Sequence, residues 1–281
     1  MLKVAVPNKG ALSEAASLML TEAGYRQRRN AKDLVTVDHD NQVEFFYLRP
    51  RDIAIYVGEG TLDVGITGRD LLLDSGAQAE EIMTLGFGAS TFRFAAPAGT
   101  LTAESELAGR RIATSYPGIV RPHLERLGIE SDVVRLDGAV ETSIRLGVAD
   151  AIADVVETGT TLRQAGLEVF GEPILRSEAV VVTRGNGTDP DGLEVFRRRL
   201  ESVIVARTYV MMDYDISTDR VEDAVRLTPG IESPTVSPLH REGWAAVRSM
   251  VPRETAQRVM DDLFAIGARG ILVTDILACR I

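Results

Sequence analysis

Hydroxyl groups and a glycine gather in the middle of the chain, where residues 152–162 read I-A-D-V-V-E-T-G-T-T-L. The apolar start predicts a strand, and a helix is expected directly after the loop. The hydroxyls of Thr158, Thr160 and Thr161 can surround one phosphate together with the local N–H groups. Gly159 allows a close approach and an unusual φ. The loop therefore predicts a phosphate site.

Two carboxylates border this loop, Asp154 at the end of the strand and Glu157 inside the loop. They would repel a polyphosphate, and the loop lacks the Gly-Lys-Ser/Thr of a Walker motif. The hydroxyls of a ribose, alone or shared with Mg²⁺, are suitable partners for such acids. The segment thus fits a ribose 5-phosphate group. The alternative is a threonine-capped helix start with both acids in solvent.

Basic residues follow two other expected strands. Lys9 and Gly10 stand where the first strand passes into the first helix, and Arg49 ends a strand before Pro50. The lysine suits a phosphate contact at this position. The planar fork of arginine suits a diphosphate or a similar group of phosphates. Either side chain could instead be an ordinary surface charge.

Three residues in other loops are candidates to face the same substrates. Asp70 would face a cleft from the opposite lobe, or cap the N-terminus of a helix. Tyr116 could stack on an aromatic ring of a ligand or pack in the core. Glu141 is expected one turn into a helix over residues 139–146, where it could also complement the helix dipole.

Polar residues in the last part of the chain suit a small ligand with an amino group. Asp215 ends an expected strand, and its carboxylate can accept a hydrogen bond from an α-amino group or an imidazole. The loop over residues 229–235 offers the hydroxyls of Ser233 and Thr235, and Gly270 lets a ligand approach the backbone. These could also be ordinary loop residues.

Short strands and helices alternate through residues 1–183, which predicts an α/β region. A weak internal echo, G-T-L-D-V-G-I-T-G at 60–68 and G-V-A-D-A-I-A-D-V-V-E-T-G at 147–159, favours two lobes that face one cleft. We expect a first lobe over 1–90 with 184–207 and a second over 91–183. The expected strands are 2–6, 34–37, 43–48, 64–67, 111–114, 133–136 and 151–156, and the expected helices are 13–23, 50–57, 70–73, 120–127, 139–146, 161–165 and 193–202.

The pattern changes near residue 208, where strands and helices follow the order βαββαβ. That order is typical of a ferredoxin-like unit. The expected strands are 209–214, 235–239, 244–250 and 270–274, and the expected helices are 218–227 and 253–266. Residues 208–281 are therefore predicted to form a separate domain.

Composition limits the function classes. The 281 residues carry a net charge of −10, which argues against a nucleic-acid binder, and no apolar run is long enough for a membrane span. Cys279 is the one cysteine, so no internal disulfide can form, and three histidines argue against a histidine-rich metal site. The first apolar stretch is too short for a signal peptide. A cytoplasmic protein is expected.

Several motifs together resemble the long form of the ATP phosphoribosyltransferase family. The loop over residues 152–162 is similar to that family's 5-phosphoribosyl-1-diphosphate (PRPP) loop, and further similar motifs follow one another along the whole chain. They are P-N-K-G at 7–10, F-F-Y-L-R-P-R-D-I at 45–53, G-I-T-G-R-D at 65–70, L-D-G-A-V-E at 136–141, L-G-V-A-D-A-I-A-D-V-V at 146–156 and P-G-I-E-S-P-T-V at 229–236.

The resemblance implies a two-lobed, periplasmic-binding-protein-like catalytic region and a C-terminal regulatory domain. It implies transfer of the phosphoribosyl group to N1 of ATP, the first step of histidine biosynthesis, with release of diphosphate. The implied catalytic residues are Lys9, Arg49, Glu141 and Asp154. The implied PRPP site is Asp154, Val155, Glu157, Thr158, Gly159, Thr160 and Thr161, and the implied ATP site is Lys9, Gly10, Arg49, Asp70 and Tyr116.

The resemblance also implies regulation and assembly. Histidine is expected to inhibit by binding at Asp215, Ile231, Ser233, Thr235, Met250 and Gly270. Mg²⁺ is expected as the cofactor, held mainly by substrate oxygens and water rather than by a protein cage. Dimers are expected to assemble into a hexamer, with no nucleic-acid or membrane partner.

Two other functions share parts of this pattern. A solute-binding protein would have two lobes and a hinge, but the missing signal peptide and the E-T-G-T-T loop argue against it. A prephenate dehydratase also joins two lobes to an amino-acid-binding domain. The segment S-T-F-R-F at residues 90–94 only faintly resembles the Thr-Arg-Phe motif of that enzyme.

Overall fold

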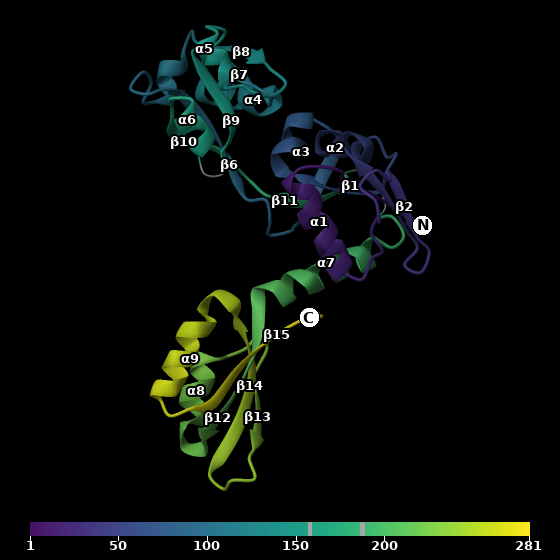
Figure 1. The fold of residues 1–281 in the computed structure, drawn as a ribbon, viewed down its shortest axis with the longest axis vertical. Helices are drawn as coiled ribbons and strands as arrows, with labels where there is room; N and C mark the ends of the chain where they lie inside the picture. Colours follow the sequence, from purple (N-terminus) through teal and green to yellow (C-terminus); the bar gives the residue numbers. More distant parts are fainter. Residues whose placement is uncertain (157–158, 186–188) are drawn as a thin grey trace. The chain divides into compact units, whose positions relative to one another are not determined.

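The chain forms two compact units in a computed structural model that describes residues 1–156, 159–185 and 189–281. The first unit comprises Met1–Leu20 and Tyr25–Leu193, and the second comprises Thr21–Gly24 and Glu194–Ile281 (Figure 1). The first unit contains two separate sheets and the second unit contains one. We call the first sheet and its helices the first lobe, and the second sheet and its helices the second lobe.

The sheet of the first lobe has six strands in the order β2-β3-β1-β4-β11-β5. Its strands are β1 (Leu2–Pro7), β2 (Val35–Asp38), β3 (Val43–Leu48), β4 (Val64–Gly68), β5 (Ala79–Thr84) and β11 (Ala179–Arg184), and its helices are α1 (Ala11–Glu22), α2 (Pro50–Gly58) and α3 (Arg69–Ser75). The central strand β4 is buried at every residue, as expected of a strand covered on both faces. Ile53 and Val57 of α2 pack into the core with Val180 and Val182 of β11.

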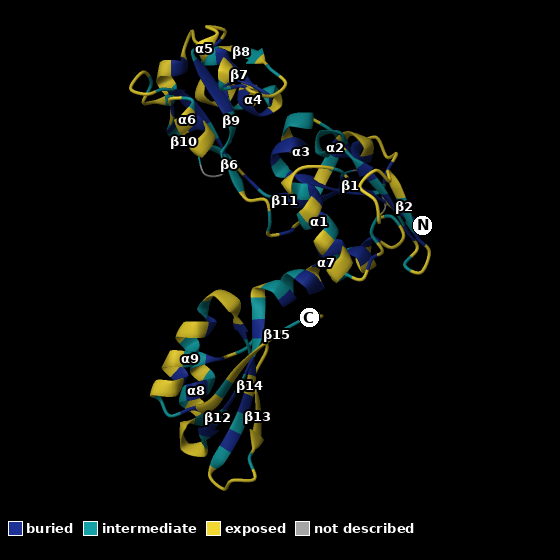
Figure 2. Cartoon of the chain, viewed as in Figure 1, coloured by how far each residue is buried: buried dark blue, intermediate teal, exposed yellow. Residues whose placement is uncertain are grey.

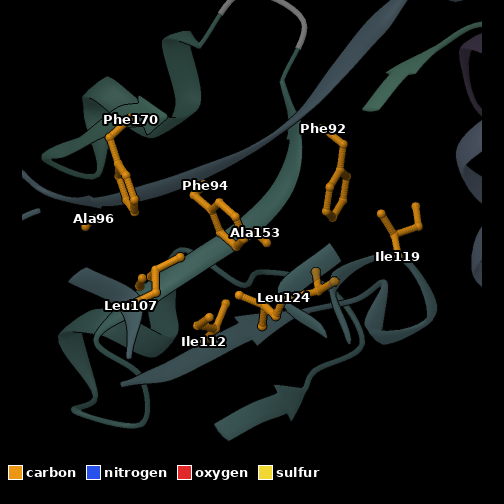
Figure 3. Packing of buried hydrophobic residues seen from close by; sticks show 11 residues of the cluster. Phe92, Phe94, Ala96, Leu107, Ile112, Ile119, Leu124, Ala153 and Phe170 are labelled. Atoms are coloured by element: carbon orange, nitrogen blue, oxygen red, sulfur yellow. The ribbon is translucent and has the colours of Figure 1, made fainter. Parts of the chain in front are cut away.

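The sheet of the second lobe has five strands in the order β10-β6-β9-β7-β8. Its strands are β6 (Ser90–Pro97), β7 (Arg111–Thr114), β8 (Asp132–Arg135), β9 (Ala151–Val156) and β10 (Leu167–Ser177), and its helices are η1 (Glu104–Leu107), α4 (Pro117–Leu127), α5 (Thr142–Arg145) and α6 (Thr160–Gln164). Phe92 and Phe94 of β6 pack with Ala153 of β9 on one face (Figure 3), and Ala95 and Ile152 pack on the other. Successive side chains of a strand point to opposite faces of the sheet, so they pack into two separate cores.

The C-terminal unit holds α7 (Leu193–Thr208) and the expected βαββαβ unit, whose order is confirmed. The unit comprises β12 (Tyr209–Ser217), α8 (Val221–Leu227), β13 (Thr235–Pro238), β14 (Trp244–Pro252), α9 (Ala256–Ala265) and β15 (Arg269–Asp275), with short 3₁₀ turns η2 (Thr218–Arg220) and η3 (Arg253–Thr255). The sheet order is β13-β14-β12-β15. Alternate residues of β12 are buried with α8 and α9, and β13 is exposed throughout (Figure 2).

The lobe boundaries differ from the expected ones. Residues 179–183 were expected in the second lobe, but β11 pairs antiparallel with β4 and β5 in the first sheet. The helix over 193–202 was expected to belong to the first lobe, whereas residues from Glu194 onward group with the C-terminal unit. Helix α7 runs without a loop into β12, which explains this grouping.

One expected helix is much shorter than predicted. Residues 139–146 give only α5 (Thr142–Arg145), because Gly138 and Ala139 have φ values of +92° and +48° and so cannot begin a right-handed helix. Glu141 consequently stands immediately before α5 rather than one turn inside a helix. The prediction of Glu141 as a helix-interior residue is therefore wrong.

Candidate functional site

Asp154 is held near the carboxyl end of β9 by a strand whose first three residues, 151–153, are fully buried. The backbone N–H of Val155 donates to Asp154 Oδ1 at 2.8 Å. Burial raises the pKa of Asp154, the hydrogen bond from Val155 lowers it, and the charges of Glu141 and Asp70 raise it again, so that the pKa lies above its ordinary value. No basic side chain forms an ion pair with Asp154 among the described residues. A hydroxyl-bearing ligand would give this carboxylate hydrogen-bond donors.

A cavity of about 280 Å³ opens beside Asp154. Its lining includes Glu141 and five residues expected in the PRPP site, namely Asp154, Val155, Gly159, Thr160 and Thr161. Gly159 has a φ of +69° and directly precedes α6, which matches its expected conformation. The other two expected residues, Glu157 and Thr158, lie outside the described part of the chain. The lining of the cavity therefore combines carboxylates with threonine hydroxyls.

A second cavity, of about 260 Å³, shares Val155 with the first. Its lining includes Lys9, Gly10, Asp70 and Tyr116, four of the five residues expected in the ATP site. Residues of both lobes contribute, since Lys9 precedes α1 and Tyr116 precedes α4. Two ligands held in these cavities would meet near Val155.

Asp70 lies in the first turn of α3, one residue inside the helix, because Gly68 is the capping residue. Its side chain is buried, and Ser177 Oγ donates to Asp70 Oδ1 at 2.8 Å while accepting from the Asp70 N–H at 3.0 Å. The carboxylate is thus fixed by the strand that leads back to the first lobe. Asp70 also lines the second cavity.

Tyr116 packs against the core of the second lobe and lines the second cavity at the same time. Its ring meets Phe92 edge-on, with a centroid separation of 5.2 Å. Burial, followed by the charge of Asp70, raises the pKa of the Tyr116 phenol, so the hydroxyl stays protonated. Both sequence interpretations, packing and substrate contact, are compatible with this position.

Arg49 lines neither cavity; it is an exposed residue directly before Pro50, which does line the second cavity. Its expected phosphate contact stays a prediction. Arg51, two residues later, was not singled out from the sequence, although its guanidinium lies 4.7 Å from the Tyr116 ring centroid. Only the three-dimensional meeting of α2 with the second lobe distinguishes Arg51 from other surface arginines.

The residues expected to bind histidine fall into two groups within the C-terminal unit. Ile231, Ser233, Thr235 and Met250 line a cavity of about 330 Å³, together with Met211, Arg248 and the last three residues of the chain. Asp215 and Gly270 lie elsewhere on the sheet, where a Cβ at Gly270 would stand 3.6 Å from Asp215 Oδ2. Met211 and Asp215 nevertheless share the face of β12 that is opposite its buried residues. One chain therefore brings four of the six together.

No group of three or more His, Cys, Asp or Glu side chains that could hold a metal ion occurs among the described residues. Across the same part of the chain, no helix has the length and apolar character needed to cross a membrane.

Comparisons with known proteins give a consistent result. The model of the family described as "ATP phosphoribosyltransferase" matches residues 49–202, and that of "HisG, C-terminal domain" matches residues 206–278. ATP phosphoribosyltransferases from Arthrobacter sp. (strain FB24) and Streptomyces coelicolor are each 65% identical to this chain, with all of both chains covered. Among solved structures, a chain of the ATP phosphoribosyl transferase (HisG:HisZ) complex from Thermotoga maritima matches with a TM-score of 0.64 and 29% identity, covering 73% of this chain and 98% of that one.

Proposed function

Because the chain belongs to the ATP phosphoribosyltransferase family, we propose that its two adjoining cavities hold the two substrates of that reaction. The enzyme joins N1 of ATP to C1 of PRPP and releases diphosphate, which is the first step of histidine biosynthesis. The cavity beside Asp154 and Gly159 binds PRPP, and the cavity beside Asp70 and Tyr116 binds ATP. The observation that carries this assignment is that both cavities are lined by Val155. Family membership leaves the solute-binding and prephenate dehydratase alternatives without support.

The PRPP cavity supplies two kinds of contact. Asp154 accepts hydrogen bonds from the ribose hydroxyls, and Glu141 lines the same cavity. The hydroxyls of Thr160 and Thr161 donate hydrogen bonds to the 5-phosphate oxygens, and Gly159, with its positive φ and no side chain, leaves room for that group. Glu157, Thr158 and Val155 complete the proposed PRPP loop.

Positioning is the main catalytic task in this proposal. Bond breaking to diphosphate leads and leaves positive character at C1, so the ATP ring nitrogen must already be close. Tyr116 holds the adenine, and Lys9 stabilises the departing diphosphate. Arg49 is proposed to assist from its exposed position before α2.

Magnesium fits this arrangement as a partner of the substrate. Asp154 and Glu141 offer two carboxylates at one cavity, too few for an all-protein cage but sufficient to contact a substrate-bound Mg²⁺ directly or through water. The ion would neutralise charge on the diphosphate leaving group. The ion and Lys9 would then share this task, and the remaining site residues orient the two substrates.

Regulation and assembly complete the proposal. Histidine binds at Asp215, Ile231, Ser233, Thr235, Met250 and Gly270 in the C-terminal unit and inhibits the reaction. We further propose that the enzyme acts in the cytoplasm as a hexamer built from dimers. In one chain the proposed histidine-binding residues form two separate groups. A complete histidine site would therefore combine one group from each of two neighbouring subunits.

A direct assay tests this function. Purified protein is mixed with ATP, PRPP and Mg²⁺, and phosphoribosyl-ATP is followed by its ultraviolet absorbance with and without histidine. Turnover that histidine suppresses is expected. No turnover with both substrates would reject the catalytic assignment, and turnover indifferent to histidine would reject the regulatory one.

A pair of glycine variants tests the PRPP loop. Gly159→Val should abolish PRPP binding, because a branched side chain fills the phosphate space and resists the φ of +69°. Gly166→Val is the matched control, since Gly166 has a φ of +74° and no atoms near its missing side chain. Both variants bear the same backbone strain, so PRPP titration separates strain from the site. Equal losses in the two variants would remove Gly159 from the site.

A further inference from the structure

Arg51 of the first lobe reaches the second lobe at the turn that carries Tyr116. Its Nη1 donates to Asp74 Oδ2 at 2.7 Å and to the Ser115 carbonyl oxygen at 3.0 Å. The Asp74 side chain is only 8% exposed, so this ion pair is shielded from solvent on the carboxylate side. One guanidinium therefore contacts a carboxylate of its own lobe and a backbone carbonyl of the other.

Asp74 in turn caps a helix of the other lobe. Helix α4 begins at Pro117, which has no N–H, and no side chain of the preceding Tyr116 caps it. The first backbone N–H of the helix is therefore that of Gly118, and it donates to Asp74 Oδ1 at 2.8 Å. A carboxylate at this position satisfies an orphan donor and favours the helix dipole. The turn from Ser115 to Gly118 is thus held at both ends by the Arg51–Asp74 pair.

Gly118 is fitted to this contact. A Cβ at Gly118 would stand 2.3 Å from the backbone oxygen of Asp74, and backbone cannot move aside as a flexible side chain can. The missing side chain is therefore a requirement of the close approach between α3 and α4. Elsewhere in a helix, alanine would be the more favourable residue.

The Tyr116 ring lies in the middle of the held turn. Arg51 contributes a cation 4.7 Å from the ring centroid, and Phe92 contacts the ring from within the second lobe. The position of the ring in the second cavity consequently depends on a pair of charges that belong to the first lobe.

We propose that Arg51 and Asp74 are positioning residues for ATP, acting through Tyr116. The proposal rests on the assignment of the second cavity to ATP. Neither residue lines the PRPP cavity, so their effect falls on one substrate. Because Arg51 and Asp74 belong to the first lobe, the position of the Tyr116 ring also depends on the contact between the lobes.

Steady-state kinetics of Arg51→Met tests this inference. The KM for ATP should rise about tenfold, which corresponds to the loss of one charge-assisted contact, while the KM for PRPP changes less than about twofold. Arg121→Met is the control, because Arg121 is exposed on α4 and has no ion pair within the described ranges. It should match the wild type. Arg51→Lys should restore part of the ATP affinity, since an ammonium can pair with Asp74 but lacks the fork.

Gly118→Ala supplies a second route to the same result. Alanine excludes the close approach to Asp74, because its Cβ would meet the Asp74 backbone. The KM for ATP should therefore rise as in Arg51→Met, while the KM for PRPP changes less than about twofold. If Arg51 acts through the ring, adding Arg51→Met to Tyr116→Ala should cause little further change.

Three results would overturn the proposal. They are an unchanged KM for ATP in both Arg51→Met and Gly118→Ala, an equal rise in the KM values of both substrates, and a full additional tenfold loss when Arg51→Met is combined with Tyr116→Ala. Wild-type turnover measured beside these variants separates the failure of this inference from failure of the enzymatic function.

Discussion

Asp150 precedes strand β9 and Asp154 lies near its carboxyl end, yet their surroundings are opposite. Asp150 directly precedes β9 and accepts three hydrogen bonds from Arg111, one from the backbone N–H at 2.9 Å and two from the guanidinium at 2.9 and 3.2 Å. The side-chain and backbone hydrogen bonds from Arg111 lower the pKa of Asp150 to about 2. Asp154, near the other end, is half-buried. Its partial burial and the charges of Glu141 and Asp70 raise its pKa.

This difference separates a stabilising carboxylate from one that is available to a ligand. At the amino end of β9, the Asp150 carboxylate is paired with Arg111 and stabilises the folded state. At the carboxyl end, charge faces a cavity and acidic neighbours, which is unfavourable until a ligand supplies donors. Open α/β sheets bind ligands at this edge, and β9 displays both uses of an aspartate within one strand.

The largest expected effect belongs to Asp154. Asp154→Asn should lower kcat/KM for PRPP about 100-fold, because the amide is a weaker acceptor for ribose hydroxyls. Its melting temperature should stay the same or rise, since repulsion from Glu141 and Asp70 is relieved. Kinetics and thermal unfolding are compared with those of Asp150→Asn, which should keep nearly full activity. Normal PRPP binding by Asp154→Asn would contradict the claim that Asp154, unlike Asp150, binds this substrate.

A third strand-borne carboxylate extends the comparison to the C-terminal unit. Asp215→Ala should weaken histidine inhibition about tenfold or more, within the usual range of a coupling between sites, while uninhibited turnover is retained. Asp261→Ala, on an exposed position of α9, is the control. Histidine titrations of activity and calorimetry give the result. Unchanged inhibition would show that Asp215 does not serve the effector.

The pH profile sharpens the contrast at Asp154. If the ionised carboxylate binds PRPP, then kcat/KM for PRPP should fall as the pH falls through the raised pKa of Asp154. Glu141→Gln removes one of the charges that raise this pKa, so the acid limb should move to lower pH. Burial is the larger cause and remains, which limits the movement. A shift of the acid limb to higher pH would contradict this electrostatic account.

The smallest effect is expected at Asp150. A depressed pKa in the folded state stabilises the protein above the unfolded-state pKa, and this stabilisation is lost as the pH falls through the folded value. Asp150→Asn should therefore lower the melting temperature by about 2 °C near neutral pH, because the pair is partly exposed. The difference from wild type should shrink as the pH falls from about 4 to about 2. A difference that persists there would exclude the ion pair as its source.

The elements that the sequence predicts best are those whose own residues show a clear hydrophobic pattern. The strands at residues 43–48 and 151–156 match β3 and β9, and the βαββαβ order is confirmed. Strands β5, β6, β10 and β11 were not predicted. Strand β5 is only partly buried, and β10 alternates irregularly around a bulge, so neither shows a clear period.

The candidate site shows the same limit. Asp154, Gly159 and Tyr116 stand at strand ends or in loops, where residue type and local order indicate a role. The sequence gives no such indication for Arg51 and Asp74, because their proposed role depends on contacts with residues far along the chain. The left-handed backbone at Ala139 likewise gives no signal, since alanine favours a helix.

The place of β11 in the first sheet sets an order for synthesis. It lies between β4 and β5, so that sheet remains incomplete until residues 179–184 have been made. All strands of the second sheet come from one continuous stretch, from Ser90 to Ser177. A nascent chain therefore has every strand of its second lobe available while its first lobe still lacks a central one. The lobe that begins later along the chain can fold earlier on the ribosome.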